Sequence, residues 1–185
     1  RKKSGWTAPC IDIGGGWTFG RPDGTGPMRQ DNDNAATFED YGTEVCEAIK
    51  DECKKRGFPL PKLKMEPGRS ISGSAGVAIG RVGAVKKHPT KTWINCDLSS
   101  NIITWVNFCH WYFPMYPVKD ALAKATQVAD LVGPLCSSDE LGQEREFPEL
   151  KRGDYISMLD CGGYTESTMA SFNAQFWPAT VLVNG

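Results

Sequence analysis

The sequence predicts a parallel α/β region followed by a mostly antiparallel β domain. The first 70 residues follow the order strand, glycine loop, helix, strand, which is typical of a β-α-β unit in a parallel sheet or barrel. The later residues form short apolar runs that glycine and proline turns separate, without long helices between them. This pattern favours a β sandwich or barrel. The boundary between the two regions falls near residues 70–85.

Composition excludes several classes of protein. The 185 residues suffice for one domain, or for one domain and part of another. A net charge of −1 provides no bulk attraction to nucleic acid or to membrane surfaces. No apolar run of about 18 residues is present, so we expect no membrane span. The expected partners therefore include neither nucleic acid nor a membrane.

The cysteines argue for a reducing compartment. There are seven of them, an odd number, widely spread and without a C-x-x-C pair. This spacing argues against both a disulfide framework and a zinc site. With only two histidines, His88 and His110, we expect no metal centre, and a cytoplasmic location fits best.

The first predicted strand lies within residues 8–16 and ends in three glycines. Ile11 and Ile13 give it buried positions, and Gly14, Gly15 and Gly16 follow. Glycines allow main-chain N–H groups to approach an anion closely, so the loop is a candidate phosphate site. A flexible turn explains the same residues, and this segment alone leaves both interpretations open.

A helix is predicted over residues 35–56, after a Pro-, Gly-, Asp- and Asn-rich loop at 21–34. Its apolar residues recur every three or four positions: Phe38, Tyr41, Val45, Ile49 and Cys53. Asn34 or Thr37 can cap its start, and Gly57 follows its basic last turn. We assign this helix to packing alone.

The second predicted strand ends at Glu66-Pro67-Gly68-Arg69. Ligands bind at the carboxyl ends of parallel strands, and here Glu66 and Arg69 place opposite charges three residues apart. Glu66 can hold a cationic group, whereas Arg69 suits a phosphate because its planar fork donates two hydrogen bonds. A surface salt bridge at a strand end is the alternative for this segment taken alone.

The second half contains six strand-like runs and two segments that carry candidate catalytic or ligand-binding residues. The runs are Val82–Val85, Thr92–Cys96, Ile102–Phe108, Gln127–Val132, Asp154–Leu159 and Ala179–Val183. A Gly-Pro turn presents Cys136, with Asp139 nearby, as a nucleophile or proton donor, or as a small buried apolar residue. Gly162 and Gly163 precede Tyr164, whose phenol can donate to a phosphate or simply lie at the protein surface.

Together and in this order, these motifs resemble the fold type III pyridoxal-phosphate decarboxylases, which have the alanine-racemase fold. The motifs are Asp12-Ile13-Gly14-Gly15-Gly16, Glu66-Pro67-Gly68-Arg69, Gly133-Pro134-Leu135-Cys136 with Asp139, Gly162-Gly163-Tyr164 and a closing Phe172-Asn173-Ala174 segment. This group includes the diaminopimelate, ornithine and arginine decarboxylases. The motifs of this chain are most similar in sequence to those of diaminopimelate decarboxylase.

The resemblance implies a fold, a cofactor and roles for particular residues. It places residues 1–75 at the end of a TIM-like (β/α)8 barrel that binds pyridoxal 5'-phosphate, and residues 76–185 in a β domain that contributes the active-site Cys and Tyr loops. By this resemblance the glycines at 14–16, Arg69 and Tyr164 hold the cofactor phosphate, and Glu66 pairs with the pyridine nitrogen. Cys136 enters the site of a neighbouring subunit and reprotonates the decarboxylated carbon. The resemblance also implies a head-to-tail homodimer with shared active sites, and a small amino acid as the substrate.

Three features depart from the family pattern. The family binds its cofactor through a Schiff-base lysine on the first barrel strand, and no lysine here has that context. We therefore expect the chain to be the C-terminal portion of a longer enzyme and to be inactive alone. Diaminopimelate decarboxylases also place an acid after the cysteine and an arginine that binds a substrate carboxylate, where this chain has Ser137 and Trp105. Both differences favour another amino acid, and Ser137 and Asp139 are the candidate substrate contacts.

Two alternatives remain open at this point. A catalytically inactive regulatory paralogue would lack the lysine, although it need not retain Glu66, Arg69, Cys136 and Tyr164. Another pyridoxal-phosphate lyase or a racemase of the same fold would retain the cofactor residues. The cysteine motif disfavours the racemase.

Overall fold

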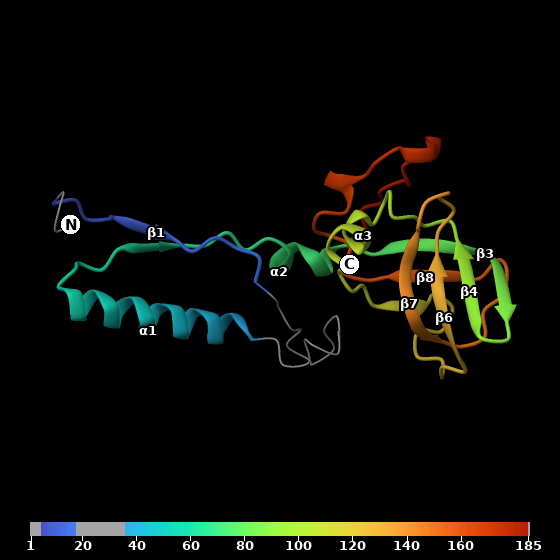
Figure 1. Cartoon of the computed structure of the whole chain (residues 1–185), viewed down its shortest axis with the longest axis horizontal. Helices are drawn as coiled ribbons and strands as arrows, with labels where there is room; N and C mark the ends of the chain where they lie inside the picture. Colours follow the sequence, from blue (N-terminus) through green and yellow to red (C-terminus); the bar gives the residue numbers. More distant parts are fainter. Residues whose placement is uncertain (1–4, 18–35, 185) are drawn as a thin grey trace. The chain divides into compact units, whose positions relative to one another are not determined.

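The structure, a computed structural model, describes residues 5–17 and 36–184. The chain divides into two compact units, Arg1–Ile71 and Ser72–Gly185 (Figure 1). Each unit contains its own sheet, two-stranded in the first and six-stranded in the second. The loop predicted at residues 21–34 and the possible cap at Asn34 lie outside the described residues.

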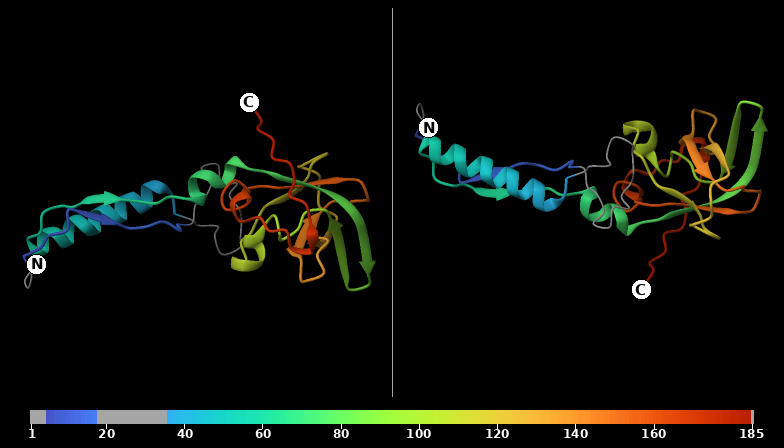
Figure 2. Two further views of the ribbon diagram at one scale, coloured as in Figure 1. Left: turned by 90° about the horizontal axis from the view of Figure 1, so that it is seen from above. Right: turned by 90° about the horizontal axis from the view of Figure 1, so that it is seen from below.

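The first unit contains a β-α-β arrangement, as the order of the sequence patterns predicts. Strand β1 (Cys10–Asp12) and strand β2 (Lys62–Lys64) pair in parallel, with Ile11 opposite Leu63. Helix α1 (Phe38–Arg56) runs alongside both strands (Figures 1 and 2). This pairing brings the carboxyl ends of β1 and β2 to the same edge of the small sheet.

Helix α1 uses Thr37, one of the two predicted caps, so it begins at Phe38 rather than at residue 35, and it ends at Arg56 as predicted. The Thr37 hydroxyl accepts a hydrogen bond from the Asp40 N–H at 3.1 Å, and the Asp40 carboxylate accepts one from the Thr37 N–H at 2.8 Å. The bonds from the Thr37 backbone and side chain lower the pKa of Asp40. Gly57 ends the helix in the left-handed conformation at φ 64°, which a residue without Cβ adopts easily.

A short helical stretch follows the Glu-Pro-Gly-Arg motif. It comprises α2 (Arg69–Ser72) and a single 3-10 turn, η1 (Gly73–Ala75). Arg69 is the first residue of α2. This stretch leads into the first strand of the large sheet.

The second unit is a six-stranded mixed sheet with strand order β5-β8-β3-β4-β6-β7. Four of the five strand pairings are antiparallel, and β4 and β6 pair in parallel. The mostly antiparallel β domain predicted from the sequence is therefore confirmed in outline. The strands are β3 (Ala78–His88), β4 (Lys91–Cys96), β5 (Met115–Pro117), β6 (Gln127–Val132), β7 (Glu140–Phe147) and β8 (Tyr155–Met158).

The sheet curls until its two edge strands nearly meet. A Cβ added to Gly142 on β7 would lie only 2.6 Å from the Met115 methyl carbon on β5. The Met115 side chain thus lies against the backbone of Gly142, and the sheet is a nearly closed barrel. Closure in this way hides strand edges that would otherwise pair with other chains.

The core of the second unit lies inside this curled sheet. Its most deeply buried members come from several strands and include Ile94, Leu131, Phe147 and Ile156, each 0% exposed. These side chains belong to one continuous hydrophobic cluster. The sheet surrounding them holds the loops of the candidate site in fixed positions.

Four of the six predicted strand runs coincide with strands, and two are wrong. Residues Ile102–Phe108 form no strand, because helix α3 (Thr104–Cys109) occupies most of that range. Ile102 and Ile103 lie just before the helix, Val106 lies within it three or four residues later, and all three side chains are buried in the core. The run Ala179–Val183 also forms no strand in the described part of the chain and is exposed.

Strand β7 was missed because its solvent side is charged. The strand carries Glu140, Glu144, Arg145 and Glu146, while Leu141 and Phe147 are almost fully buried.

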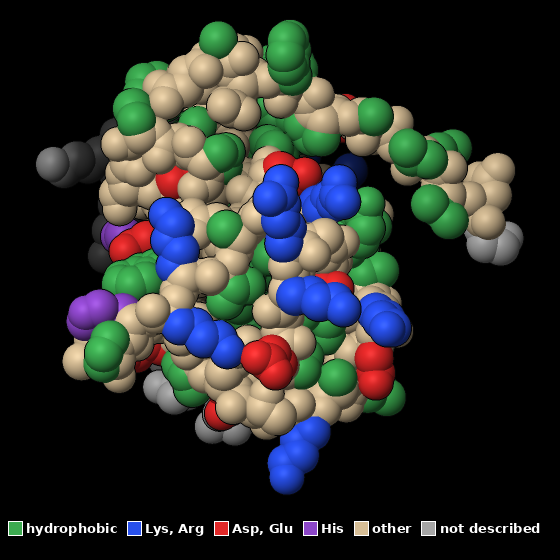
Figure 3. Space-filling view, turned by 90° about the vertical axis from the view of Figure 1, so that its right-hand side faces the viewer, with side chains coloured by type: hydrophobic (Ala, Val, Ile, Leu, Met, Phe, Trp, Pro, Cys, Tyr) green, Lys and Arg blue, Asp and Glu red, His purple; other side chains and the backbone are tan. Residues whose placement is uncertain are grey.

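The surface around the β3–β4 hairpin is polar. Figure 3 shows Lys and Arg side chains interspersed with Asp and Glu on this side of the molecule. Lys87 pairs with Glu149 at 3.0 Å, and Lys91 pairs with the buried Asp130 at 2.5 Å. None of the helices described in the structure has the length and apolar character needed to cross a membrane.

Candidate functional site

The glycine loop and the Glu-Pro-Gly-Arg motif lie next to each other in the first unit. The Ile13 N–H donates to the Lys64 carbonyl at 3.1 Å, and the Glu66 N–H donates to the Gly14 carbonyl at 2.8 Å. Backbone pairing thus continues past the ends of β1 and β2. Two motifs that are fifty residues apart in sequence meet at one sheet edge, as parallel pairing predicts.

Gly15 makes this close approach possible. A Cβ at position 15 would lie 2.1 Å from the Glu66 carbonyl oxygen, which no side chain tolerates. Gly14 and Gly16 adopt left-handed conformations at φ 68° and 77°, with open space where a side chain would point. The Gly14 N–H donates to the Asp12 carboxylate at 2.9 Å. The three glycines therefore form a bare backbone loop against the end of the neighbouring strand.

This half of the site fits the cofactor that the resemblance implies. The loop offers unshielded backbone beside an exposed Glu66, and the partly buried Arg69 follows three residues later. Main-chain N–H groups and a guanidinium suit a phosphate, and a carboxylate suits a protonated ring nitrogen. The structure brings Gly14, Gly15 and Glu66 together. The assignment of a phosphate to Arg69 stays a prediction.

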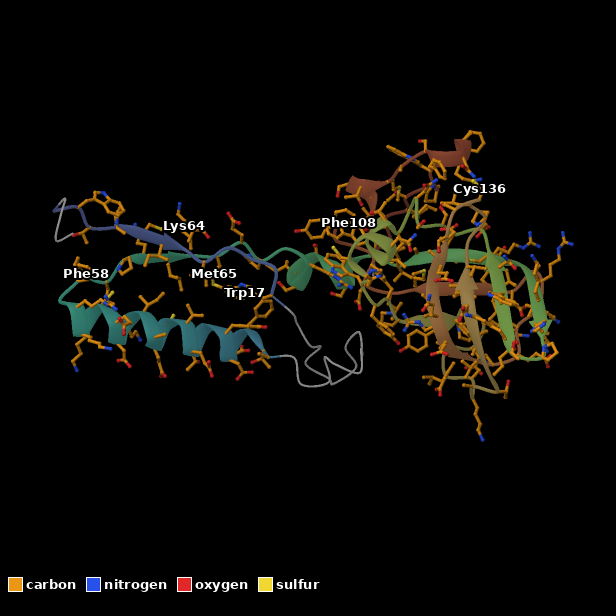
Figure 4. The ribbon with its side chains drawn as sticks, viewed as in Figure 1. Trp17, Phe58, Lys64, Met65, Phe108 and Cys136 are labelled. Atoms are coloured by element: carbon orange, nitrogen blue, oxygen red, sulfur yellow. The ribbon has the colours of Figure 1, made fainter. Side chains whose placement is uncertain are left out.

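Side chains near this edge point to opposite sides of β2. Figure 4 shows Lys64 on the side away from α1 and Met65 on the side of α1. The Trp17 ring packs against Tyr41 of α1, with ring centroids 5.1 Å apart. The loop is thus anchored to the helix by an aromatic contact.

In the second unit, Cys136 lies on the loop between β6 and β7. The thiol is exposed and donates to the Asn173 side-chain oxygen at 3.6 Å. Ser137, next to it, is exposed as well. The turn that carries Asn173 is held in place by Asn101, whose amide donates to the Phe172 carbonyl at 2.7 Å.

Asp139 fixes the shape of this loop through hydrogen bonds to the backbone. Its side chain is 5% exposed and accepts hydrogen bonds from the Ser100 N–H at 2.7 Å and from the Leu135 N–H at 3.0 Å. A Cβ at Gly133 would lie 2.1 Å from the same carboxylate, so only glycine fits there. Both carboxylate oxygens of Asp139 are thus engaged by the backbone. The predicted substrate contacts of Asp139 and Ser137 stay predictions.

Tyr164 lies on a loop that packs tightly against the segment after α2. The Gly162 N–H donates to the Gly73 carbonyl and the Cys161 N–H to the Gly76 carbonyl, both at 2.9 Å. A Cβ at Gly162 would lie 2.0 Å from the Ser72 carbonyl oxygen. Tyr164 itself is 44% exposed, so its phenol is accessible to a ligand.

Helix α3 connects the cysteine loop with the tyrosine loop. The Asn107 amide donates to the Ser138 carbonyl at 3.1 Å, two residues after Cys136. At the other end of the helix the Thr104 and Thr168 hydroxyls share a hydrogen bond of 2.6 Å, and Thr168 also donates to the Tyr164 carbonyl. Sequence reasoning missed this connection because it read the segment as a strand.

Asn173 is another residue of the candidate site to which the sequence analysis gave no role of its own. It lies 37 positions after Cys136, so no local pattern connects the two residues. A weak signal was available, since Asn173 belongs to the closing motif of the resemblance. The structure places that motif against the thiol.

The matching sequence family settles the assignment. Residues 11–162 match the family described as "Pyridoxal-dependent decarboxylase, C-terminal sheet domain". The chain belongs to the pyridoxal-dependent decarboxylases. The match spans the glycine loop, the Glu-Pro-Gly-Arg motif and the cysteine loop, and it ends at Gly162.

Known pyridoxal-dependent decarboxylases resemble the chain over nearly its whole length. It is 29% identical to diaminopimelate decarboxylase of Haemophilus influenzae over 185 residues, which cover 100% of this chain and 41% of that protein. It is 31% identical to the Aquifex aeolicus diaminopimelate decarboxylase, covering 98% of this chain and 40% of that protein. The crystal structure of the Methanocaldococcus jannaschii enzyme superposes with a TM-score of 0.78 at 26% identity, covering 94% of this chain and 38% of that one.

The chain spans about two fifths of the length of the curated relatives it matches. The matched family region is their C-terminal sheet domain. The nearly closed mixed sheet of the second unit is consistent with that domain.

Proposed function

We propose that this chain is the C-terminal portion of a pyridoxal 5'-phosphate-dependent amino-acid decarboxylase similar to diaminopimelate decarboxylase. The observation that carries the proposal is the contact between the glycine loop and Glu66, where the missing Cβ of Gly15 brings two motif backbones together. A purely structural turn does not require a carboxylate and an arginine at the adjoining strand end. A phosphate-bearing cofactor with a basic ring nitrogen requires both.

The first unit provides the cofactor half of the proposed site. The Gly14–Gly16 loop, through the N–H groups of Gly15 and Gly16, and the guanidinium of Arg69 bind the phosphate, while the Gly14 N–H is held by the Asp12 carboxylate. The Glu66 carboxylate binds the ring nitrogen and keeps it protonated. When bound, the cofactor supplies an electron sink for the carbanion that remains after loss of CO2.

The second unit provides the proton donor. Cys136 is exposed on its loop and donates its thiol proton to the carbon that has lost CO2, and the Asn173 oxygen orients that thiol. The Tyr164 phenol donates to the cofactor phosphate. Ser137 and Asp139 lie on the cysteine loop, where Ser137 is exposed to a substrate.

The proposed architecture follows the relatives. Residues 1–75 end a (β/α)8 barrel that carries the cofactor-binding lysine upstream, and residues 76–185 form the β domain. Two subunits associate head to tail in a homodimer, so that Cys136 of one subunit enters the active site of the other. The substrate is a small amino acid. All seven cysteines are free, which supports a cytoplasmic location.

Turnover by the full-length protein tests this function. We expect CO2 release from at least one amino acid in the presence of pyridoxal phosphate. Because general acids typically contribute about 10²- to 10⁴-fold, Cys136→Ala should lower kcat by about 10²-fold or more while cofactor affinity is retained. Cys109→Ala, at another exposed cysteine, is the matched control.

Each result of that experiment has a distinct meaning. Equal losses of turnover and cofactor affinity in Cys136→Ala would assign Cys136 a structural role. Cofactor binding without CO2 release from any amino acid would favour an inactive regulatory paralogue. Racemisation without CO2 release would favour a racemase of the same fold.

A further inference from the structure

The Cys136 thiol and its acceptor Asn173 belong to two segments that are far apart in sequence. Cys136 lies on the loop between β6 and β7 (Figure 4), and its thiol donates to the Asn173 side-chain oxygen at 3.6 Å. Both residues are exposed. A hydrogen bond between two exposed groups contributes little, because water competes for both of them. Their alignment therefore needs support from groups that water does not reach.

The turn before helix α3 provides that support on both sides. On the cysteine side, the Ser100 N–H donates to the Asp139 carboxylate at 2.7 Å, and the Leu135 N–H donates to the same carboxylate at 3.0 Å. On the other side, the Asn101 side-chain amide donates to the Phe172 carbonyl at 2.7 Å. Leu135 and Phe172 directly precede the thiol and its acceptor in sequence. Together with the thiol bond, these contacts form a closed ring of hydrogen bonds that runs through the turn.

Asn101 is the buried member of the ring that holds the acceptor. Its side chain is 6% exposed, and Asp139 on the opposite side of the ring is 5% exposed. The Asn101 backbone carbonyl also accepts from the Ala170 N–H at 3.0 Å. One residue thus holds the segment before the acceptor at two points. Removal of a buried partner leaves a polar group unsatisfied, which costs more than the loss of an exposed bond.

The turn that carries the acceptor needs such a restraint. Asn173 and Ala174 both adopt left-handed conformations, at φ 59° and 54°. Asparagine visits this conformation readily, whereas alanine is strained in it. A strained turn persists only where contacts around it fix its shape. Without the bond from Asn101, we expect the turn to relax and to carry the Asn173 oxygen away from the thiol.

We propose that Asn101 is a positioning residue for the proton donor, which acts through the Asn173 turn to direct the Cys136 thiol toward one face of the carbon that has lost CO2. The proposal rests on the proposed decarboxylase function and adds a residue to its proton-transfer step. Every member of the ring belongs to the second unit of one chain. Each subunit therefore orients its own thiol, which then serves the active site of the other subunit.

The direction of the thiol has a chemical consequence. When the bond to CO2 breaks, its electron pair stays on the carbon, the thiol proton forms the new C–H bond, and the thiolate regains a proton from water. A thiol held in one direction delivers its proton to one face of that carbon. A thiol that rotates freely, or water in its place, reaches both faces. The expected signature of Asn101 is therefore the configuration of the product.

Alkylation of Cys136 in the full-length protein tests the ring without turnover. Iodoacetamide reacts with the sulfur only after its hydrogen bond to Asn173 breaks. Asn101→Ala should therefore raise the rate of Cys136 alkylation, measured by mass spectrometry, by about two- to tenfold, as expected for the loss of one hydrogen bond. Gln127→Ala is the matched control, because it removes an amide bond of 2.9 Å to the Pro148 carbonyl at the other end of β6. It should leave the rate unchanged.

A double substitution tests whether Asn101 acts through Asn173. Asn173→Gly removes the acceptor and retains the left-handed backbone. It should raise the alkylation rate as much as Asn101→Ala does, and the double variant should show no further rise, because both changes open the same ring. If Asn101→Ala fails to fold, Asp139→Asn opens the ring at another bond and should raise the rate as well. Alkylation of the exposed Cys109 serves as the internal reference and should stay constant.

Turnover in D2O tests the direction of proton delivery. The substrates are the standard L-amino acids, L-ornithine and meso-diaminopimelate, each with pyridoxal phosphate. Each product molecule gains one deuteron at the carbon that lost CO2, and NMR of the derivatised product gives its configuration. The unmodified protein and Gln127→Ala should give one configuration. Asn101→Ala should give both, with a lower kcat and an unchanged KM, because substrate binding does not involve the ring.

Several outcomes would overturn the proposal. These are a Cys136 alkylation rate that Asn101→Ala leaves unchanged, an equal rise in Gln127→Ala, and effects of Asn101→Ala and Asn173→Gly that add. A single product configuration from Asn101→Ala would also contradict it. If the alkylation rates follow the prediction but none of these amino acids releases CO2, the positioning of the thiol by Asn101 stands and the decarboxylase proposal fails.

Discussion

The two units of the chain differ in how they bury apolar surface. Among the described residues, every fully buried hydrophobic side chain except Cys53 belongs to the second unit. In the first unit, Ile11, Phe58 and Leu60 are exposed by 38%, 39% and 63%. The second unit therefore has a core of its own, whereas the first has a β-α-β arrangement without one.

This difference indicates which of the two units needs packing from other parts of the protein. Parallel strands are normally covered on both faces, and β1 and β2 are covered on one face by α1. The first unit thus contains the proposed cofactor site but little packing to stabilise it. Further α/β units of the proposed barrel would supply that packing. The second unit holds its loops in place through its own core.

The largest effect is expected from a cavity in the core of the second unit. Phe147 is 0% exposed, so Phe147→Ala should lower the free energy of unfolding by about 3–5 kcal/mol. Phe58→Ala removes the same ring from an exposed position in the first unit and should cost less than about 0.5 kcal/mol. Urea unfolding of the 185-residue chain, followed by circular dichroism, measures both. Similar losses in the two variants would contradict the contrast between the units.

A smaller effect is expected at the base of the cysteine loop. Asp139→Ala leaves two partly buried N–H groups without their acceptor and should cost about 2–3 kcal/mol. Asp120→Ala, at an exposed turn where the side chain accepts from Leu122 N–H, should cost about 0.5 kcal/mol or less. Proteolysis of the folded chain reports the loop directly, with cleavage near Cys136 rising only in the Asp139 variant. A cleavage pattern that did not change would show that the carboxylate is dispensable.

The smallest of the three effects concerns a buried thiol at high pH. Burial raises the pKa of Cys96 from 9.0 to about 12. Above pH 9 the unfolded chain loses this proton while the folded chain keeps it, so stability falls as the pH rises toward 12. At pH 10 the loss from this group is on the order of 1 kcal/mol, and Cys96→Ala should remove it. Urea titrations at pH 8 and pH 10 measure the difference, which would be absent if Cys96 ionised freely.

Thiol alkylation offers a check on the same contrast. Iodoacetamide at pH 8 should modify the partly exposed Cys46 of the first unit and leave Cys96 unmodified until the second unit unfolds.

Local patterns predicted the first unit well. The period of Phe38 to Cys53, the Thr37 cap and Gly57 all describe one helix, and each depends only on near neighbours in the sequence. The meeting of Gly15 with Glu66 was implied by parallel pairing of the flanking strands. Its closeness, which excludes any side chain at position 15, was visible only in the structure.

The second unit was harder to predict because its arrangement depends on distant contacts. Ile102, Ile103 and Thr104 are β-branched and favour a strand, yet Ile102 and Ile103 precede helix α3, Thr104 begins it, and Val106 within it also reaches the core. The apolar run Val181–Val183 has strand composition but no ladder partner among the described residues.

The central claim is that the glycine loop and Glu66 form part of a pyridoxal-phosphate site. The most direct test compares two glycine substitutions in the full-length protein. Gly15→Ala places a methyl group 2.1 Å from the Glu66 carbonyl oxygen and must push the loop away from the strand end. Gly42→Ala, in helix α1, meets no atom within 4 Å and serves as the matched control.

The measurement is the dissociation constant of pyridoxal phosphate, determined by equilibrium dialysis. We predict that Gly15→Ala weakens binding by about tenfold or more, which corresponds to about 1.4 kcal/mol, while Gly42→Ala binds the cofactor as the unmodified protein does. Cofactor affinity that is the same in both variants and in the unmodified protein would contradict the assignment of this loop to the cofactor.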